Sequence, residues 1–306
     1  MRVLLLDAVH KFNSILRKSS LLSLFLLLYS FPAFSQERRL NPFTDFSRLW
    51  LEWNIIPNTQ WAPNAIDPAA RSNKTLQLIR FQPVFPIKIS NDWTVISRTV
   101  MQFIDKPSAE PSFVFDQENQ SIGFLGYKQQ NKFGLHSINP SFFFVPDTGS
   151  NSAFGVGPSL AISVPNSVSK NKFGVGPALM AFKQFGRTTL GIRARKIWSI
   201  NNRSDNDYLN IFVAQPVLRY QLSNNWFFVS SPIINADFNL NQPWTLPVGG
   251  GIGRSFKFSN NRYTALMSLE AYFNAIKPKF DNGESLLGDW TIRAQLQIAI
   301  PDSNSF

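Results

Sequence analysis

The residues with the plainest catalytic potential form a short polar run around the only histidine beyond residue 35. His136 is followed directly by Ser137 and, three residues after the histidine, by Asn139. A serine nucleophile needs a histidine base within hydrogen-bond reach. Adjacent residues of a strand point to opposite faces, so a strand would keep His136 and Ser137 apart. We therefore expect no catalytic residues here and no enzymatic activity.

Two further features argue against bound cofactors. The glycine-rich run 249–253 is not a phosphate loop, because no helix is expected to follow it; glycines inside a strand more often mark curvature or close packing. The chain contains no cysteine, which excludes disulfides, thiol chemistry and cysteine-ligated metals. We expect no cofactor and no metal.

A set of charged and amide side chains suggests a different function, because its members share the polar face of alternating segments. Two readings remain open: the arginines pair with acids and neighbours to fill an interior, or they form a basic lumen that favours anionic or aromatic-acid solutes. The residues that we expect to line such a lumen are Arg80, Gln82, Arg98, Gln102, Arg193, Arg195, Glu270, Arg293, Gln295 and Gln297.

The elements that would position these side chains are most visible where the chain repeats itself. Residues 154–158 and 173–177 both read Phe-Gly-Val-Gly-Pro. From Phe154 to Val164 every second residue is apolar, and the residues between are small or weakly polar. This period of two predicts strands with one apolar face, and the polar residues 166–171 predict a hairpin loop between them.

The same alternation recurs through the chain and predicts an all-β fold. We expect twelve strands, the first of them weakly patterned, at residues 48–60, 74–90, 93–105, 132–146, 154–164, 173–185, 188–200, 208–222, 226–238, 244–258, 262–276 and 289–300.

The connections between these strands alternate in length. Long connections are expected at 61–73, 106–131, 166–171, 201–207, 239–243 and 277–288, with 106–131 as the longest loop. Short ones are expected at 91–92, 147–151, 186–187, 223–225 and 259–261. Bacterial outer-membrane barrels have an even number of strands, short periplasmic turns and longer outer loops. The pattern therefore predicts a transmembrane antiparallel up-and-down β-barrel whose apolar face meets lipid.

The N-terminal region and the composition fit this interpretation. Residues 1–35 read as a signal peptide, with basic residues, a short apolar run and small residues before Gln36. We expect 36–47 to be an N-terminal periplasmic segment that could plug the lumen, and 48–306 to be the barrel. Charged residues make up 16% of the chain and the formal net charge is +11; soluble domains usually contain about 25% charged residues.

Several phrases resemble a known family. They include Arg80-Phe81-Gln82-Pro83-Val84, Asn139-Pro140-Ser141-Phe142-Phe143-Phe144 and Ala181-Phe182-Lys183-Gln184. Together with the Phe-Gly-Val-Gly-Pro repeats, they look like a group of outer-membrane transporter barrels related to the "MetA-pathway of phenol degradation" proteins, often labelled neuromedin U. The resemblance covers roughly residues 41–300 and implies the fold and an outer-membrane location rather than a solute.

We therefore predict an exported outer-membrane barrel that passes small solutes passively. The alternatives are a structural barrel without flux and, less favoured, an outer-membrane phospholipase-like enzyme. The expected partners are outer-membrane lipid and lipopolysaccharide, the barrel-assembly machinery, which would read the terminal aromatic Phe306, and a small-molecule solute; no nucleic acid is expected.

Overall fold

The computed structural model describes residues 41–61, 72–116, 121–147, 151–169, 171–200, 208–258, 263–279, 285 and 287–301, all within one compact unit. The predicted signal peptide and residues 36–40 lie outside the described residues. Within these ranges no helix has the length and apolar character needed to cross a membrane.

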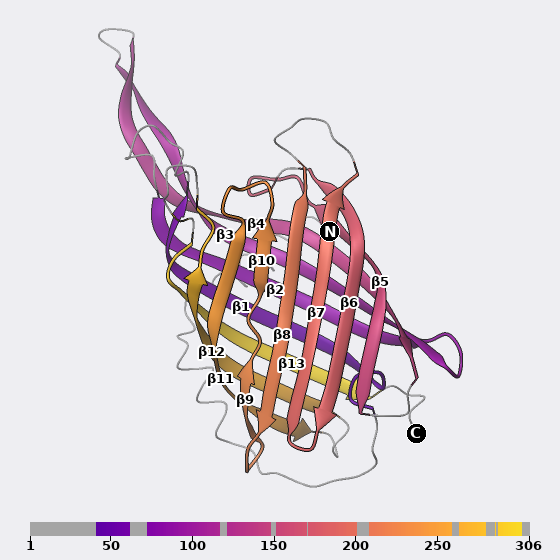
Figure 1. Cartoon of the computed structure of the whole chain (residues 1–306). Coiled ribbons are helices and arrows are strands. Elements are labelled where there is room, and N and C mark those ends of the chain that lie inside the picture. The colour runs from indigo at the N-terminus through magenta and orange to yellow at the C-terminus, as the bar shows by residue number, and fades with distance from the viewer. Residues whose placement is uncertain are drawn as a thin grey trace. The chain divides into compact units, whose positions relative to one another are not determined.

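The described chain consists of strand segments that follow one another around a barrel (Figure 1). They are β1 (Phe46–Trp61), β2 (Ser72–Lys88), β3 (Trp93–Asp116), β4 (Ser121–Pro146), β5 (Ser152–Ser163), β6 (Phe173–Phe185), β7 (Thr188–Ser199), β8 (Asn210–Gln221), β9 (Trp226–Ser230), β10 (Ile234–Asp237), β11 (Trp244–Phe258), β12 (Tyr263–Ile276) and β13 (Trp290–Pro301).

The barrel is closed, because the first and last strands pair with each other. β1 pairs with β13 in antiparallel register from Phe46↔Pro301 to Ile55↔Ile292, and each strand otherwise pairs with its neighbour in the sequence. β9 and β10 share one position, since both pair with β8 on one side and β11 on the other. The thirteen segments thus occupy twelve positions, which confirms the predicted twelve-stranded antiparallel barrel.

Two predicted elements need correction. The expected loop 106–131 is wrong: β3 and β4 stay paired from Lys106↔Lys132 to Asp116↔Ser121, beyond the last pairings of β3 with β2 and of β4 with β5. The hairpin therefore extends past the barrel (Figure 1). The predicted strand 226–238 is interrupted between Ser230 and Ile234. Pro232 has no amide proton for a ladder, and the Ser231 amide donates instead to the hydroxyl of Tyr272.

Apart from the β3–β4 connection, which is short because the hairpin stays paired up to Asp116↔Ser121, the connections between strand positions alternate in length as the sequence predicted. At one end, Gly186 (φ 53°) makes a two-residue turn between β6 and β7, and Asn224 (φ 54°) and Asn225 (φ 64°) lie between β8 and β9. Glycine and asparagine tolerate these left-handed conformations best. We call this the short-turn end of the barrel and the opposite one, where residues 277–289 connect β12 to β13, the long-loop end.

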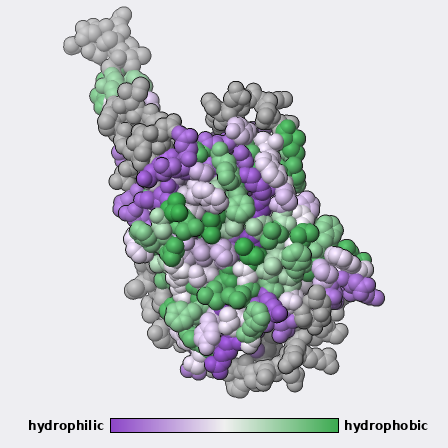
Figure 2. All heavy atoms as spheres, in the orientation of Figure 1, coloured by the Kyte–Doolittle hydropathy of each residue, from purple (hydrophilic) through white to green (hydrophobic). Residues whose placement is uncertain are grey.

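The barrel exposes apolar side chains and buries polar ones, which is the reverse of the usual distribution in a soluble protein. Large apolar side chains are exposed on the outer face, such as Phe154 at 57% and Leu179 at 39%. Figure 2 shows apolar side chains gathered across this face. Polar side chains are buried on the inner face, with Ser159 at 0% and Glu270 at 1%. Contiguous exposed apolar surface of this extent marks a contact with lipid or protein, and a closed barrel leaves no unpaired strand edge in a bilayer.

Candidate functional site: two chambers in a basic lumen

A cavity of about 390 Å³ occupies the barrel interior toward the long-loop end. Its wall carries Arg80, Arg98, Arg193 and Arg195, with Glu52 as the acid among them and Asp237 farther along. Serine and asparagine side chains complete the polar lining. We call this cavity the long-loop chamber.

A second cavity of about 460 Å³ lies toward the short-turn end. Its arginines are Arg48, Arg98, Arg187, Arg193 and Arg219, and no aspartate or glutamate is among its described lining residues. Much of the remaining wall is apolar or aromatic: Phe43, Phe46, Trp50, Val84, Ile96, Phe143, Met180 and Phe182. We call this cavity the short-turn chamber.

The two chambers share a partition made by three residues. Arg98, Phe143 and Arg193 line both cavities. Arg98 Nη2 donates a hydrogen bond to Gln82 Oε1, and Arg193 Nη2 donates to Gln215 Oε1 at 3.1 Å. These bonds orient two guanidinium groups at the boundary that the chambers share.

Aromatic rings hold Arg193 in place. Its Cζ lies 4.5 Å from the ring centroid of Trp50 and 5.6 Å from that of Phe182. A guanidinium over an aromatic face is stabilised by the ring quadrupole, and this contact leaves its N–H groups free to point elsewhere. The position of Arg193 in the partition is therefore set by Trp50, Phe182 and Gln215 together.

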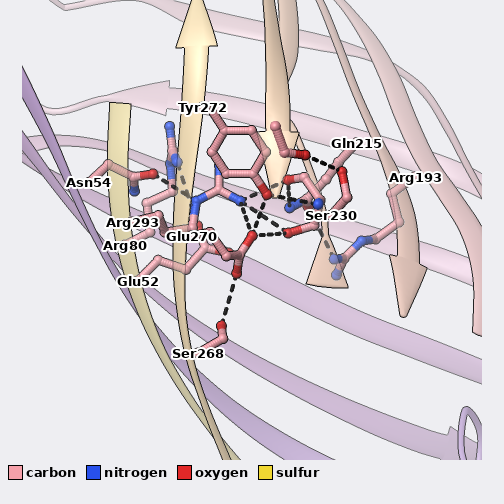
Figure 3. A network of polar contacts seen from close by, with 12 residues as sticks. Glu52, Asn54, Arg80, Arg193, Gln215, Ser230, Ser268, Glu270, Tyr272 and Arg293 are labelled. Atoms are coloured by element: carbon pink, nitrogen blue, oxygen red, sulfur yellow. Dashed lines mark hydrogen bonds and ion pairs between the residues drawn. The ribbon is translucent and has the colours of Figure 1, made fainter. Parts of the chain in front are cut away.

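Another interior acid, Glu270, is held in a separate network at the strand interruption (Figure 3). Glu270 Oε2 lies 3.5 Å from Arg293 Nη1, and it accepts hydrogen bonds from the Tyr272 hydroxyl and from Ser231 Oγ. Glu270 is 1% exposed and Arg293 is 2% exposed. Arg293 Nη1 also donates to the Ser231 carbonyl at 2.7 Å. These contacts replace the ladder bonds that the interrupted strand lacks.

The predicted lumen residues separate into four groups in the structure. Arg80, Gln82, Arg98, Gln102, Arg193 and Arg195 line the long-loop chamber, and Gln297 lines the short-turn chamber. Glu270 and Arg293 belong to the buried network instead. Gln295 lies opposite Glu52 and Ser268 in the ladder and lines neither chamber.

Several side chains that line these chambers carry a buried nitrogen atom without a hydrogen-bond partner among the described residues. These atoms are Arg48 Nε, Trp50 Nε1, Arg98 Nε, Arg193 Nε and Arg195 Nη1. A buried donor without a partner costs free energy, on the order of 1–3 kcal/mol and more for a charged group. The acceptor Glu52 Oε1, in the long-loop chamber, has no described partner either. Among the described lining residues of the two chambers, arginines outnumber acids.

The sequence reasoning missed the interior residues of the first strand. Arg48, Trp50 and Glu52 alternate with Leu49, Leu51 and Trp53. Glu52 is 1% exposed and pairs with Arg80 at 3.5 Å. The alternation of these residues could have identified the inner face of this strand. Trp50 obscured the alternation, because an apolar side chain is not expected on a polar inner face.

The chain before β1 contributes to the short-turn chamber. Phe43 stacks on Phe182, with ring centroids 5.4 Å apart, and packs against the buried cluster that contains Met180. Asn41 Nδ2 donates to the Ser152 carbonyl at 3.2 Å, which fixes this turn to β5. Residues 41–45 therefore lie against the inner wall, and Pro42 and Phe43 line the cavity.

The candidate catalytic run is arranged differently from the prediction. Gln102 pairs with Ser137 and Phe103 with Leu135, so His136 is a bulged residue and both His136 and Ser137 line the long-loop chamber. The expectation that they face opposite sides is wrong. Nevertheless, Ser137 Oγ accepts a hydrogen bond from Asn139 Nδ2 at 2.8 Å, and His136 Nδ1 has no hydrogen-bond partner among the described residues. The described contacts contain no nucleophile–base pair.

Comparisons with known proteins support the fold. No family model matches the chain, and no curated protein matches it. An outer membrane channel from Pseudomonas putida F1 aligns with 10% identity and a TM-score of 0.50, covering 84% of this chain and 95% of that one. The P. putida toluene transporter TodX aligns at 10% identity with a TM-score of 0.43, covering 84% and 90% of the two chains. The outer membrane phospholipase A of Escherichia coli aligns at 12% identity with a TM-score of 0.38, covering 85% and 97%. The protein therefore has the fold of an outer-membrane β-barrel, and its resemblance to the phenol-degradation group stays a prediction.

Proposed function

We propose that the chain is an outer-membrane channel that passes small anionic solutes passively through its lumen. The observation that carries the proposal is the charge of the interior: the two chambers together are lined by Arg48, Arg80, Arg98, Arg187, Arg193, Arg195 and Arg219, against Glu52 and Asp237. Glu52 is already paired with Arg80. Rings of arginine favour anions and repel cations.

The location follows from the same proposal. The predicted signal peptide, residues 1–35, would direct export, and the apolar outer face of the barrel would meet lipid. Outer-membrane lipid, lipopolysaccharide and the barrel-assembly machinery are the partners that such a location entails. Residues 36–47 are proposed as a segment that narrows the short-turn end; the packing of Phe43 on Phe182 supports this for their described part.

A variant that blocks the lumen tests whether the protein is a channel or a structural barrel without flux. Ala161 lines the long-loop chamber, whereas Ala271 is exposed on the outer face. In a planar bilayer, the wild-type protein should conduct, Ala161→Trp should lose most of the conductance, and the matched control Ala271→Trp should keep it. Absence of wild-type current would favour a barrel without flux. Equal conductance in both variants would show that ions do not pass through this lumen.

A further inference from the structure

The short-turn chamber combines aromatic and aliphatic side chains with guanidinium groups. Its apolar wall is formed by Phe43 and Phe182, which stack beside the buried cluster that contains Val84, Ile96 and Met180. The guanidinium groups are accompanied by no described acid. The long-loop chamber contains Glu52 and Asp237, and its apolar lining residues, such as Leu209, Ile211 and Val213, are mostly aliphatic rather than aromatic. An ordinary aqueous passage has no need for an aromatic wall.

Guanidinium groups and an indole line this chamber. Arg48, Trp50, Arg98 and Arg193 all line the cavity, and in each of them one buried nitrogen atom has no hydrogen-bond partner among the described residues. A carboxylate offers several lone pairs and can accept from an arginine and a second donor together. Chloride would satisfy the charge, but it would leave the apolar wall without a partner.

The size of the cavity fits a small organic ligand. Its volume of about 460 Å³ falls within the roughly 300–1,000 Å³ of ligand pockets, which are mostly apolar with a few placed polar groups. The ring of Phe182 is seated over Gly191, where an added Cβ would lie 2.1 Å from Phe182 Cδ1. The backbone of β7 thus provides the space that this aromatic wall requires.

From these features we infer that the short-turn chamber binds small aromatic carboxylates, with the ring against Phe43 and Phe182 and the carboxylate on Arg48, Trp50 and the partition arginines. This inference rests on the proposed function, because it names the solute class that the channel would retain before release at the short-turn end. Arg98 and Arg193 would hold the carboxylate as it leaves the long-loop chamber, and Arg48 would hold it beyond the partition.

Equilibrium dialysis of the detergent-solubilised full chain tests this inference without requiring flux. Three probes separate the contributions: benzoate carries ring and charge, benzamide keeps the ring without the charge, and acetate keeps the charge without the ring. Protein-free micelles correct for partitioning. Benzoate should bind at least about tenfold more tightly than either of the other two, since each lacks either the ring or the charge. Equal binding of acetate and benzoate would overturn the aromatic site.

Two variants assign the binding to this chamber. Trp50→Phe removes the Nε1 donor but keeps an aromatic ring under Arg193, and Arg48→Gln removes a charge that does not line the long-loop chamber. Arg48→Gln should weaken benzoate binding about tenfold or more and Trp50→Phe several-fold, while the hairpin control Lys128→Gln should change nothing. Unchanged affinity in Arg48→Gln would contradict the inference.

The two proposals fail separately. Benzoate binding without any bilayer current would leave the site standing and remove the channel. An anion-selective current in a protein that binds benzoate no better than acetate would leave the channel standing and remove the site.

Discussion

Arg293 Nε donates a 2.9 Å hydrogen bond to Asn54 Oδ1 across the seam where the last strand meets the first. The two residues are also Cα partners in the β1–β13 ladder. The same guanidinium contacts Glu270 and Ser231, so one side chain ties the seam to the strand interruption. Barrel closure and the geometry of the interrupted strand are therefore coupled through the interior.

Removal of this guanidinium should weaken the whole barrel. Arg293→Met leaves the buried Glu270 carboxylate without its ion pair, and breaking a buried pair on one side costs about 3–5 kcal/mol. Guanidinium-induced unfolding in micelles should show a loss of this order. The double variant Arg293→Met/Glu270→Gln should recover part of it, because no unpaired charge remains. If the double variant is as unstable as the single one, the ion pair is not the cause.

Charge on the outer face should be costly at mid-strand. Leu179 lies near the middle of β6 and is 39% exposed on the outer face. Leu179→Arg should destabilise the barrel in lipid by about 2–4 kcal/mol, as arginine does at the midplane of a bilayer. Gln184→Arg, on the inner face of the same strand, should cost less than about 1 kcal/mol. Refolding equilibria in bilayers measure both, and a harmless Leu179→Arg would mean that this face meets water.

Much of this fold could be predicted from the sequence. Apolar and polar residues alternate wherever one face of a strand meets lipid and the other meets the lumen. The predicted bounds of β6 and β11 agree with the structure: residues 173–185 and 244–258. The hairpin extension of β3 and β4 was missed. Beyond residue 105 neither arm lies in the wall of the barrel, so neither needs an apolar face, and Pro107 and Pro111 suggest a loop.

The features that shape the site come from distant partners and are absent from any local pattern. The alternation continues through Ser231, but the break there depends on Tyr272 and Arg293 from other strands. The bulge at His136 is set by its register with β3, and it brings His136 and Ser137 to one face. The alternation predicted that each of these arginines points inward. It could not predict their separation into two chambers, because that depends on the aromatic and amide side chains of other strands that pack between the arginines.

The aromatic wall should respond to a single methyl group. Gly191→Ala places a Cβ that would meet the Phe182 ring at 2.1 Å, so the ring must turn into the short-turn chamber. We expect benzoate affinity to fall several-fold while the unfolding free energy changes by no more than about 1–3 kcal/mol. Gly126→Ala is unsuitable as a control because its φ is +119°. Ala161→Gly, in the other chamber, serves instead, and an equal loss in both variants would argue against a local effect.

The β3–β4 hairpin extension contains an ion pair, Glu110–Lys132, whose contribution to stability should depend on pH. Glu110 Oε1 lies 2.5 Å from Lys132 Nζ. The hydrogen bond from Lys132 and its charge lower the pKa of the Glu110 carboxyl below its ordinary value. A lowered folded-state pKa means that the pair stabilises the hairpin above the unfolded-state pKa and that this contribution is lost as the pH falls through the folded-state pKa.

Carbon-13 NMR titration of the glutamates measures this shift. In Lys132→Met the pKa of Glu110 should return toward the ordinary value, and the pKa should be unchanged in Lys257→Met, which alters the distant strand β11. A Glu110 pKa that is the same in the wild type and in Lys132→Met would show that the ion pair does not persist in solution.

The reversal potential of the wild-type protein in a planar bilayer under a KCl gradient tests the central claim most directly. A lumen lined by arginines predicts a potential displaced toward the chloride equilibrium potential, and Arg195→Gln should reduce that displacement, because Arg195 lines the long-loop chamber. A potential displaced toward that of potassium, or no measurable current, would contradict the account.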